Sequence, residues 1–461
     1  MEVLQRTANR GSISTGGYDI NNSLKFEEDN SEVIATTNQA AGDRKTWTFS
    51  AWVKRTEITY DYATIFGAEF TIIKFLGDDR LELALYNGTY YSLITTQKFR
   101  DTSAWYHIVA VCDTTQATAS ERSRLYVNGE RVTVFDTSNS PPLNSEFAIG
   151  QAGSAGSGAW LRLGQFFAGS DYFNGYMAEV HYLNGTAAQA SDFGEYDSDS
   201  GIWVPKEYTG GGYGTQGFYY KFDNSANLGE DSSGEGHDAN SINNITSADQ
   251  ATDTPTNNGC TLNVLASLEG SNDITEGALV STGKAGGGGN FNGTYGTIGI
   301  DPFNSSVDWY WEIETSIGTS GSDTDIGIGW IKESRITSGS TAYNNVYADG
   351  ISRYSSQTVN AAGDIWGVLL ETGTTPVMKL YRNDGLIYTA THGSGGVSFD
   401  TLMFPYITVK GTSVDARLNF LNPASSFSIA SGNTDPNGYG NFEFDPKGGY
   451  ALCTKNLAEY G

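Results

Sequence analysis

One order of sequence elements occurs twice along this chain and restricts its fold more than any other feature. A tryptophan-led apolar stretch, Trp105–Val111, precedes a hairpin pattern at Leu125–Val132, and later Asp364–Leu370 precedes a hairpin pattern at Met378–Tyr388. Both hairpins turn at Asn/Asp-Gly, residues that tolerate the positive φ of a tight type I′ turn, and alternating apolar residues flank both turns. The repeat predicts two all-β modules of related topology in tandem.

Length and composition agree with this prediction. A chain of 461 residues allows two to four domains, at about 150 residues each. It contains 57 glycines, 13% aromatic residues and only 17% charged residues. This balance is typical of β-sandwiches, whose turns need glycine and whose strands favour aromatic side chains.

The formal net charge of -26 and the pI near 4.4 argue against binding to nucleic acid, which needs a clustered basic surface. The N-terminus has no apolar signal core, and no stretch approaches 18 apolar residues. The sequence therefore predicts a soluble protein made in a cytoplasm, without membrane insertion.

Composition shifts divide the chain into four segments: an N-terminal arm (1–20), a first module (21–210), a bridge rich in Gly, Asn and Asp (211–258) and a second module (259–461). The arm carries Arg6 and Arg10 and is either a frayed tail or an attachment segment that docks on another chain. We favour attachment, because its Ser/Thr/Ile stretch has the character of a strand that adds to a neighbour.

Alternation within the first module predicts its core. Trp47, Phe49, Ala51 and Val53 share one face of a strand and should be buried. Residues 186–196 are the one segment that resembles a short helix. Cys112 ends an apolar strand and should be a buried thiol, whereas Cys260 and Cys453 lie near the two ends of the second module, either as reduced thiols or as a disulfide.

Several stretches resemble two families of concanavalin-like sandwiches. The stretches that resemble the laminin-G/pentraxin type are Trp47–Lys54, Trp105–His107, Leu125–Gly129 and Phe173–Val180. Those that resemble a SPRY-type module are Trp309–Glu314, Ile326–Trp330 and Tyr381–Gly385. The resemblance implies an all-β fold of two tandem concanavalin-like jelly-roll β-sandwiches behind a short N-terminal arm.

The sequence between the two modules gives a more specific resemblance than either module alone. Asp192–Lys206 followed by Asp231–Asp238 is similar to a combination met in structural proteins of marine and cyanobacterial tailed phages. Since laminin-G and SPRY folds each serve many roles, only the tandem points to a virion. The resemblance implies a non-enzymatic surface component of a phage particle, in a tail fibre, a host-recognition appendage or a capsid decoration.

Two carboxylates raise the question of catalysis. Glu312 and Glu314 lie two apart on a strand, so they project from one face, an arrangement that glycosidases on this fold also use. Alternation makes that face the solvent-exposed one, opposite Trp309, Trp311 and Ile313. The third carboxylate of the laminarinase-like enzymes is replaced by Ser316, and we predict no enzymatic activity.

Calcium is a candidate ligand, because laminin-G and pentraxin modules often bind it through loop carboxylates. Asp223, Asp231 and Asp238 punctuate a Gly/Ser-rich loop, and Asp78-Asp79 forms a second acidic turn. The alternative is that these side chains cap backbone amides in turns.

Tyrosine-rich loops are the stronger candidates for function, since they combine aromatic faces with amides, as sugar sites do. The candidate residues, for a glycan or for a protein contact, are Tyr90, Tyr91, Tyr208, Tyr213, Tyr343, Asn345 and Tyr347. Tyrosine is also enriched at protein interfaces, so both interpretations stay open.

Taken together, these features predict a non-enzymatic virion surface protein of a tailed phage, most simply a tail appendage that recognises a host-surface glycan. We expect it to bind other virion proteins through its arm and to form a homo-oligomer. The alternatives are a capsid decoration (head fibre), a free calcium-dependent lectin and a glycoside hydrolase.

Overall fold

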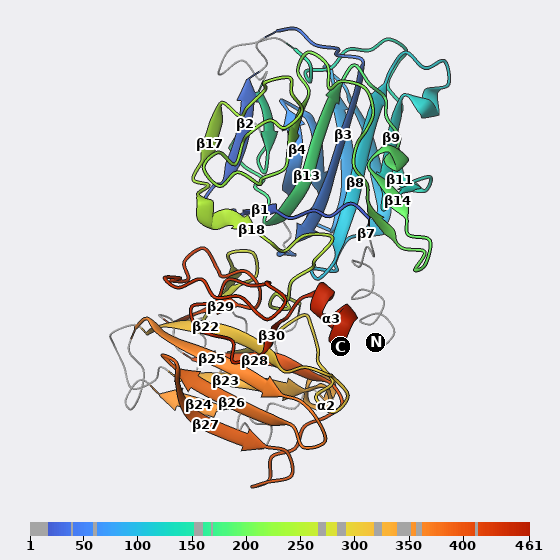
Figure 1. Cartoon of the computed structure of the whole chain (residues 1–461). Helices are drawn as coiled ribbons and strands as arrows, with labels where there is room; N and C mark the ends of the chain where they lie inside the picture. The colour runs from blue at the N-terminus through green and yellow to red at the C-terminus, as the bar shows by residue number, and fades with distance from the viewer. Residues whose placement is uncertain are drawn as a thin grey trace. The chain divides into compact units, whose positions relative to one another are not determined.

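The computed structural model describes residues 17–37, 40–58, 62–151, 160–166, 169–265, 273–283, 292–317, 325–338, 352–355, 362–410 and 414–461. The chain divides into two compact units, here the first unit (Ser14–Thr256) and the second unit (Asn257–Gly461) (Figure 1). In the described residues of both units, nearly all regular secondary structure is β-strand, so the predicted all-β class is confirmed. Within the described ranges, no helix has the length and apolarity needed to cross a membrane.

The first unit packs two sheets face to face. The strands of sheet A are β1 (Ser23–Phe26), β3 (Thr46–Arg55), β8 (Trp105–Asp113), β9 (Ser123–Val127), β10 (Glu130–Arg131), β13 (Gly175–Asn184), β16 (Phe218–Tyr220) and β18 (Gln250–Ala251). Their order is β10-β9-β8-β3-β13-β1-β18, with β16 also paired to β13. Short 3₁₀ turns lie at Ala119–Glu121, Ala190–Asp192 and Ser247–Asp249.

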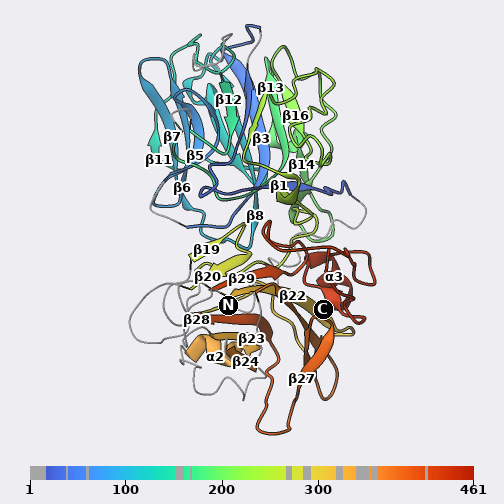
Figure 2. The same cartoon turned by 90° about the vertical axis from the view of Figure 1, so that its left-hand side faces the viewer.

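Sheet B forms the other layer of the first unit. Its strands are β2 (Val33–Thr37), β4 (Ala63–Ala68), β5 (Thr71–Phe75), β6 (Arg80–Tyr86), β7 (Tyr90–Lys98), β11 (Phe135–Ser138), β12 (Trp160–Leu163) and β17 (Ser241–Asn243). Their order is β11-β7-β6-β5-β4-β12-β2-β17, and Figure 2 shows β5, β6, β7 and β11 close together.

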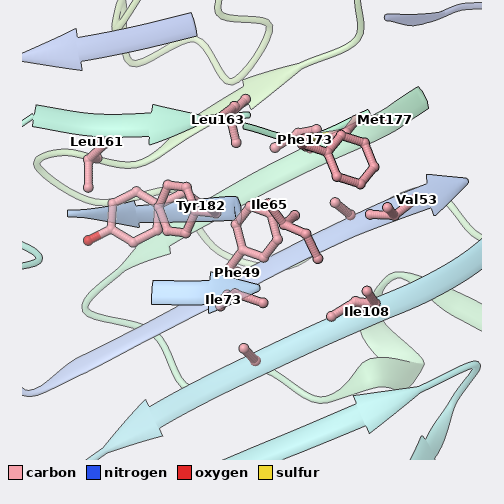
Figure 3. Packing of buried hydrophobic residues seen from close by; sticks show 14 of the residues in the cluster. Phe49, Val53, Ile65, Ile73, Ile108, Leu161, Leu163, Phe173, Met177 and Tyr182 are labelled. Carbon is pink, nitrogen blue, oxygen red and sulfur yellow. The ribbon is translucent and has the colours of Figure 1, made fainter. Parts of the chain in front are cut away.

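The core between these sheets follows from alternation. Trp47, Phe49, Ala51 and Val53 are fully buried, as predicted for the inner face of β3. Figure 3 shows how Phe49 and Val53 pack with apolar side chains of both sheets. Burial of a large apolar side chain contributes about 1.5–3 kcal/mol, so such a core stabilises the unit without a disulfide.

The segment predicted as a bridge is part of the first unit. Residues 211–256 contribute β16, β17 and β18, which pair with β13, β2 and β1. Its last residues are also fixed, because Thr256 Oγ1 accepts from the Ile20 amide at 3.1 Å and donates to the Ile20 carbonyl at 2.9 Å. The Gly, Asn and Asp content reflects tight turns between short strands, and the boundary falls after Thr256.

The helix expected over residues 186–196 is wrong in extent. Only Ala190–Asp192 forms a 3₁₀ turn, after which β14 (Gly194–Tyr196) pairs with β15 (Trp203–Pro205). The Asp192 carboxylate accepts from the Gln189 amide at 2.7 Å. A short polar side chain that bonds the backbone in this way favours turns over helix continuation.

The second unit packs an eight-stranded sheet against a four-stranded one. The strands of the larger sheet are β19 (Asp273–Thr275), β20 (Val280–Thr282), β22 (Trp309–Ile317), β25 (Asp364–Glu371), β26 (Val377–Arg382), β27 (Gly385–Thr391), β29 (Val414–Asn419) and β30 (Tyr450–Ala451). Those of the smaller are β21 (Asn292–Tyr295), β23 (Asp325–Lys332), β24 (Ser352–Ser355) and β28 (Met403–Lys410). The helices α2 (Glu333–Ser338) and α3 (Thr454–Tyr460) complete the unit.

Strand order in the second unit is β19-β20-β29-β22-β25-β26-β27, with β30 beside β22, and β21-β28-β23-β24. Both predicted hairpins form, but the second turns at Asn383-Asp384, one residue before the predicted Asp-Gly pair. Asn128 and Gly129 have φ of 49° and 82°, and Asn383 and Asp384 have φ of 45° and 71°. These positive values at two successive central residues are those of a type I′ turn.

The three cysteines are free, buried thiols. Gly259 bridges Cys453, and the Cys260 amide donates to the Leu452 carbonyl at 2.9 Å. The two ends of the second unit therefore pair in the reduced state.

A buried carboxylate in the first unit makes its stability depend on pH. Burial and the neighbouring Asp249 raise the pKa of Glu32 to about 7. The folded state then holds a proton that the unfolded state releases near pH 4.5, so stability falls as pH rises from about 5 through 7. We expect a loss on the order of 2 kcal/mol for this group. Glu32→Gln, which imitates the protonated form, should flatten the melting-temperature profile between pH 5 and 8, and Asp29→Asn, an exposed neighbour, should not.

Candidate functional site

Three connections of sheet B bring aromatic rings together at the surface. The β6–β7 hairpin pairs Tyr86 directly with Tyr90, and the two ring centroids lie 4.6 Å apart. The turn residues between them are exposed, and Gly88 has a φ of 100°, which favours glycine. The hairpin therefore presents its ring pair beside a polar, exposed tip that includes Asn87 and Thr89.

Neighbouring connections add two more rings. Phe70, in the turn between β4 and β5, lies 5.0 Å from the Tyr86 ring and 6.4 Å from the Tyr90 ring, both edge to face. Phe166, which follows β12, lies 5.9 Å from Phe70. We refer to Phe70, Tyr86, Tyr90 and Phe166 as the Tyr90 cluster. Tyr90 is 50% exposed and the other three are half-buried, so the rings present aromatic surface to solvent.

The hydroxyl of Tyr90 keeps its proton at neutral pH. Partial desolvation, with smaller contributions from Tyr86 and Glu82, raises its pKa above the usual value. It can therefore donate a hydrogen bond, while Asn87 and Thr89 supply further donors and acceptors.

Tyr91 does not belong to this surface. It follows Tyr90 on a strand, so it points to the opposite face, where it is half-buried against the core and lies 6.4 Å from the Phe147 ring. The structure thus separates the two neighbouring tyrosines that the sequence grouped together.

Tyr208 and Tyr213 lie on the outer face of sheet A, in an aromatic layer that covers it. Tyr213 is only 8% exposed, and its hydroxyl is 2.8 Å from Nδ1 of His181. Tyr208 stacks on Phe193 at 4.9 Å. Their role in the structure is to cover the sheet, so Tyr213 offers no free aromatic face to a ligand.

A carboxylate anchors the same layer. Glu179 is buried at a bulge in β13 with a φ of 50°. It accepts from the Tyr219 hydroxyl at 2.6 Å and from the Tyr18 hydroxyl at 3.0 Å. Residues 17–20 of the predicted arm therefore pack on the first unit, whereas Arg6 and Arg10 lie outside the described residues.

The acidic loop proposed for calcium uses its carboxylates in turns. Asp231 accepts from the amides of Tyr219, Ser233 and His237 at 2.8–2.9 Å. Asp238 accepts from the Asp231 amide at 2.8 Å, and Asp223 is exposed. Across the described residues no three His, Cys, Asp or Glu side chains gather closely enough to hold a metal ion. Calcium binding here stays a prediction.

The second acidic turn forms ion pairs. Asp79 is buried between Arg55, at 3.1 Å, and Arg100, at 2.6 Å. Asp78 pairs with Arg80 at 2.7 Å, and this hydrogen bond lowers the pKa of Asp78. Both carboxylates already have cationic partners.

The prediction that Glu312 and Glu314 face solvent is wrong. Glu312 is fully buried and accepts from the Tyr310 hydroxyl and from the amides of Glu443 and Phe444 at 2.8–3.0 Å. Glu314 is 4% exposed and accepts from the Ser428 amide at 2.7 Å. The segment after β29 covers both, while Trp309, Trp311 and Ile313 form the core on the opposite face, as predicted.

The remaining predicted residues, Tyr343, Asn345 and Tyr347, lie outside the described residues. The sequence reasoning missed Phe70, Tyr86 and Phe166. A signal was present for one of them, because a turn that pairs residue 86 with residue 90 places two tyrosines side by side. Phe70 and Phe166 join through sheet order, which sequence spacing does not reveal.

Comparison with known proteins supports the fold of the first unit. The family model for the concanavalin A-like lectin/glucanases superfamily, of the laminin G type, matches residues 28–191. No curated protein is similar in sequence to this chain.

Solved structures show only weak likenesses. A heptameric SAP-like pentraxin from Limulus polyphemus is 14% identical, with 36% of this chain and 78% of that chain covered and a TM-score of 0.26. The SPRY domain of human HERC1 is 9% identical, with coverage of 34% and 96% and a TM-score of 0.25. Domains LG4-5 of the mouse laminin alpha1 chain are 9% identical, with coverage of 88% and 91% and a TM-score of 0.26. These values are too low to assign a ligand. The family match covers residues 28–191 only, and the two-sheet fold of the first unit agrees with the concanavalin-like class that it describes.

Proposed function

We propose that this chain is a non-enzymatic glycan-recognition protein on the surface of a tailed-phage virion, in a tail fibre or appendage. The observation that carries recognition is the Tyr90 cluster, in which four aromatic rings from three connections of sheet B meet at the surface. The match of residues 28–191 to the concanavalin A-like lectin/glucanases superfamily supports the carbohydrate-recognition part of this proposal.

The physical argument rests on what a sugar offers. A pyranose ring has an apolar C–H face, which stacks on an aromatic ring, and hydroxyls at its rim, which need hydrogen-bond partners. The half-exposed Tyr90 ring supplies the stacking surface, and Asn87 and Thr89 lie at the adjoining tip. Phe70 and Tyr86 contact the Tyr90 ring and restrict its motion. The Tyr90 side chain therefore loses little conformational entropy when a ligand binds.

The virion location rests on the tandem organisation and on the resemblance of the run between the modules to those of phage structural proteins. The net charge of -26 suits a protein that remains outside a particle filled with anionic genome. Immunogold labelling of particles should place this chain at the tail tip, and label spread over the capsid would favour a decoration.

Removal of one aromatic face should weaken glycan binding. We expect Tyr90→Ala to reduce binding to a glycan selected on an array roughly tenfold, since loss of a stacked ring costs about 1–2 kcal/mol. Tyr90→Phe should retain most of it, because the ring remains. The measurement is biolayer interferometry with the immobilised glycan.

Tyr62→Ala is the matched control for this experiment. Tyr62 is a similarly exposed tyrosine of the first unit, 48% accessible, whose ring contacts Lys74 outside the Tyr90 cluster. Its removal should leave glycan binding unchanged. Equal loss in both variants, or none in Tyr90→Ala, would contradict the assignment of the Tyr90 cluster.

A further inference from the structure

One charged side chain of sheet B has no partner in the described part of the chain. Arg162 lies on β12, where Leu161 and Leu163 point into the core, so alternation places the Arg162 side chain on the outer face of the sheet. Among the described residues its guanidinium has no hydrogen-bond or ion-pair partner, although its Nη1 atom is buried. Burial alone lowers the pKa of Arg162, and no described carboxylate offsets this effect.

An arginine without a partner is unusual in so acidic a chain. The sequence contains 53 Asp and Glu residues against 27 Lys and Arg. The buried Arg55 lies 3.1 Å from Asp79, and Arg80, which is half-buried as Arg162 is, lies 2.7 Å from Asp78. A charge that is partly removed from water without a partner costs free energy. An anion that binds at Arg162 would recover that cost.

Two further polar groups on this face are buried without a hydrogen-bond partner in the described residues. The half-buried Trp160 precedes Arg162 by two positions on β12, its ring centroid lies 5.7 Å from the guanidinium, and its Nε1 is one of them. The other is Oγ1 of Thr64, which pairs with Lys74 of β5 and so shares the outer face. The indole and the hydroxyl can both donate, as the guanidinium does. This part of the sheet therefore presents donors that lack an acceptor.

Arg162 lies beside the Tyr90 cluster. It is directly opposite Gly67 of β4, from which the chain reaches Phe70 in three residues, and from Arg162 the chain reaches Phe166 in four. The rings of Phe70 and Phe166 lie 5.9 Å apart, so the two segments that diverge at Arg162 meet again at the cluster. Three residues of extended chain span about 10 Å. A short oligosaccharide can therefore reach both the aromatic rings and the guanidinium.

We propose that Arg162 binds the carboxylate of an acidic pyranose, so that the glycan recognised at the Tyr90 cluster contains a uronic acid. This inference rests on the proposed function, because the Tyr90 cluster supplies the stacking surface. A planar guanidinium matches a carboxylate through two parallel N–H···O bonds. The net charge of -26 disfavours non-specific attraction of anions, so a specific cationic group is needed to hold one.

The test is a ligand-observed NMR titration of the full chain with matched pairs of sugars. The methyl glycosides of glucuronic, galacturonic and mannuronic acid are each compared with the corresponding methyl ester, which keeps the ring and its hydroxyls but removes the charge. We expect at least one acid to bind at least fivefold more tightly than its ester, with a smaller preference in 1 M salt. The 6-sulfates of the parent hexosides form the second arm, and tighter binding of a sulfate than of any acid would overturn the carboxylate part of the proposal.

Variants separate the guanidinium from the aromatic rings. Arg162→Gln should abolish the preference for the acid and leave binding of the ester unchanged, and Arg162→Lys, which keeps the charge without the planar fork, should retain part of the preference. Tyr90→Ala should weaken acid and ester alike. Arg80→Gln is the control, because it removes a guanidinium that already pairs with Asp78, and it should change neither.

Stability provides a second measurement. Because Arg162 has no carboxylate partner among the described residues, Arg162→Met should keep or raise the melting temperature of the first unit. Arg55→Met, which takes the partner from the buried Asp79, should lower it by several degrees. A fall in Arg162→Met as large as that in Arg55→Met would assign Arg162 a structural role and contradict the inference.

The outcomes distinguish the inference from the proposed function. Equal binding of acid and ester in all three pairs, with both lost in Tyr90→Ala, would overturn the role of Arg162 and keep glycan recognition at the Tyr90 cluster. A preference for an acid that Arg162→Gln abolishes and Tyr90→Ala leaves unchanged would support Arg162 and contradict the Tyr90 cluster. A preference that persists in Arg162→Gln would place the carboxylate elsewhere and overturn the inference.

Discussion

Asp253→Ala should lower the free energy of unfolding of the first unit by about 3–5 kcal/mol, because it removes the carboxylate that neutralises a buried ammonium group. Lys54 is fully buried, and its Nζ lies 2.7 Å from Oδ2 of Asp253. The Trp105 indole donates to the other oxygen at 3.0 Å. For a unit of this size, the melting temperature should fall by roughly 6–20 °C. Differential scanning calorimetry of the full chain measures this change.

Two further variants serve as controls for the Asp253→Ala measurement. Asp136→Ala removes a carboxylate that pairs with Arg80 at the surface, and we expect a change below about 1 kcal/mol. The double variant Lys54→Met, Asp253→Leu replaces the pair by apolar groups and should recover much of the lost stability. If Asp253→Ala melts like the unaltered chain, residues 211–256 are not an integral part of the first unit.

Glu312→Ala should destabilise the second unit by on the order of 4 kcal/mol, since each buried donor left without an acceptor costs about 1–3 kcal/mol. The donors are the Tyr310 hydroxyl and the amides of Glu443 and Phe444. Glu312→Gln should also destabilise, because its amide group would face these donors. Thermal unfolding followed by near-ultraviolet circular dichroism reports on the tryptophans of this core.

The control is Glu371→Ala. Glu371 is one-third exposed and pairs with Lys379 at the surface, at 2.5 Å, so its removal should cost less than about 1 kcal/mol. A hydrolase would behave differently, with Glu312→Gln abolishing cleavage of a glycan while leaving the fold intact. Unchanged stability together with lost hydrolysis would therefore contradict the structural role of Glu312.

Alternation and turn chemistry were sufficient to predict the all-β class and much of the core. The inner face of β3 and the face of β22 that carries Trp309 and Trp311 are both buried. The two type I′ turns were also predictable, because few residues tolerate their backbone angles. These properties are local, so the sequence records them directly.

The covering segments could not be predicted in the same way. A period of two shows which side chains point away from a core, but not whether another segment lies over them. Glu312 was therefore predicted to be exposed, although residues after β29 bury it. Tyr213 was predicted to be a loop residue, although it packs on sheet A. Long-range contacts of this kind join residues more than 100 positions apart in the case of Glu312 and Phe444.

The candidate site shows the same limit. Tyr90 was predictable as an exposed loop aromatic, and its pairing with Tyr86 follows from the hairpin. Phe70 and Phe166 join them because β5 lies beside β6 and β12 lies beside β4 in the sheet. The site depends on the order of strands, which no local pattern encodes.

Hydrogen exchange of the full chain, with and without the array-selected glycan, tests recognition at the Tyr90 cluster most directly. We expect slower exchange in the bound state at the amides around Phe70, Asn87–Tyr90 and Phe166. The amides of residues 208–219 should not change, because that segment is already packed against sheet A. Protection at residues 208–219, or in the second unit alone, with none at the three connections of sheet B, would contradict the proposed site.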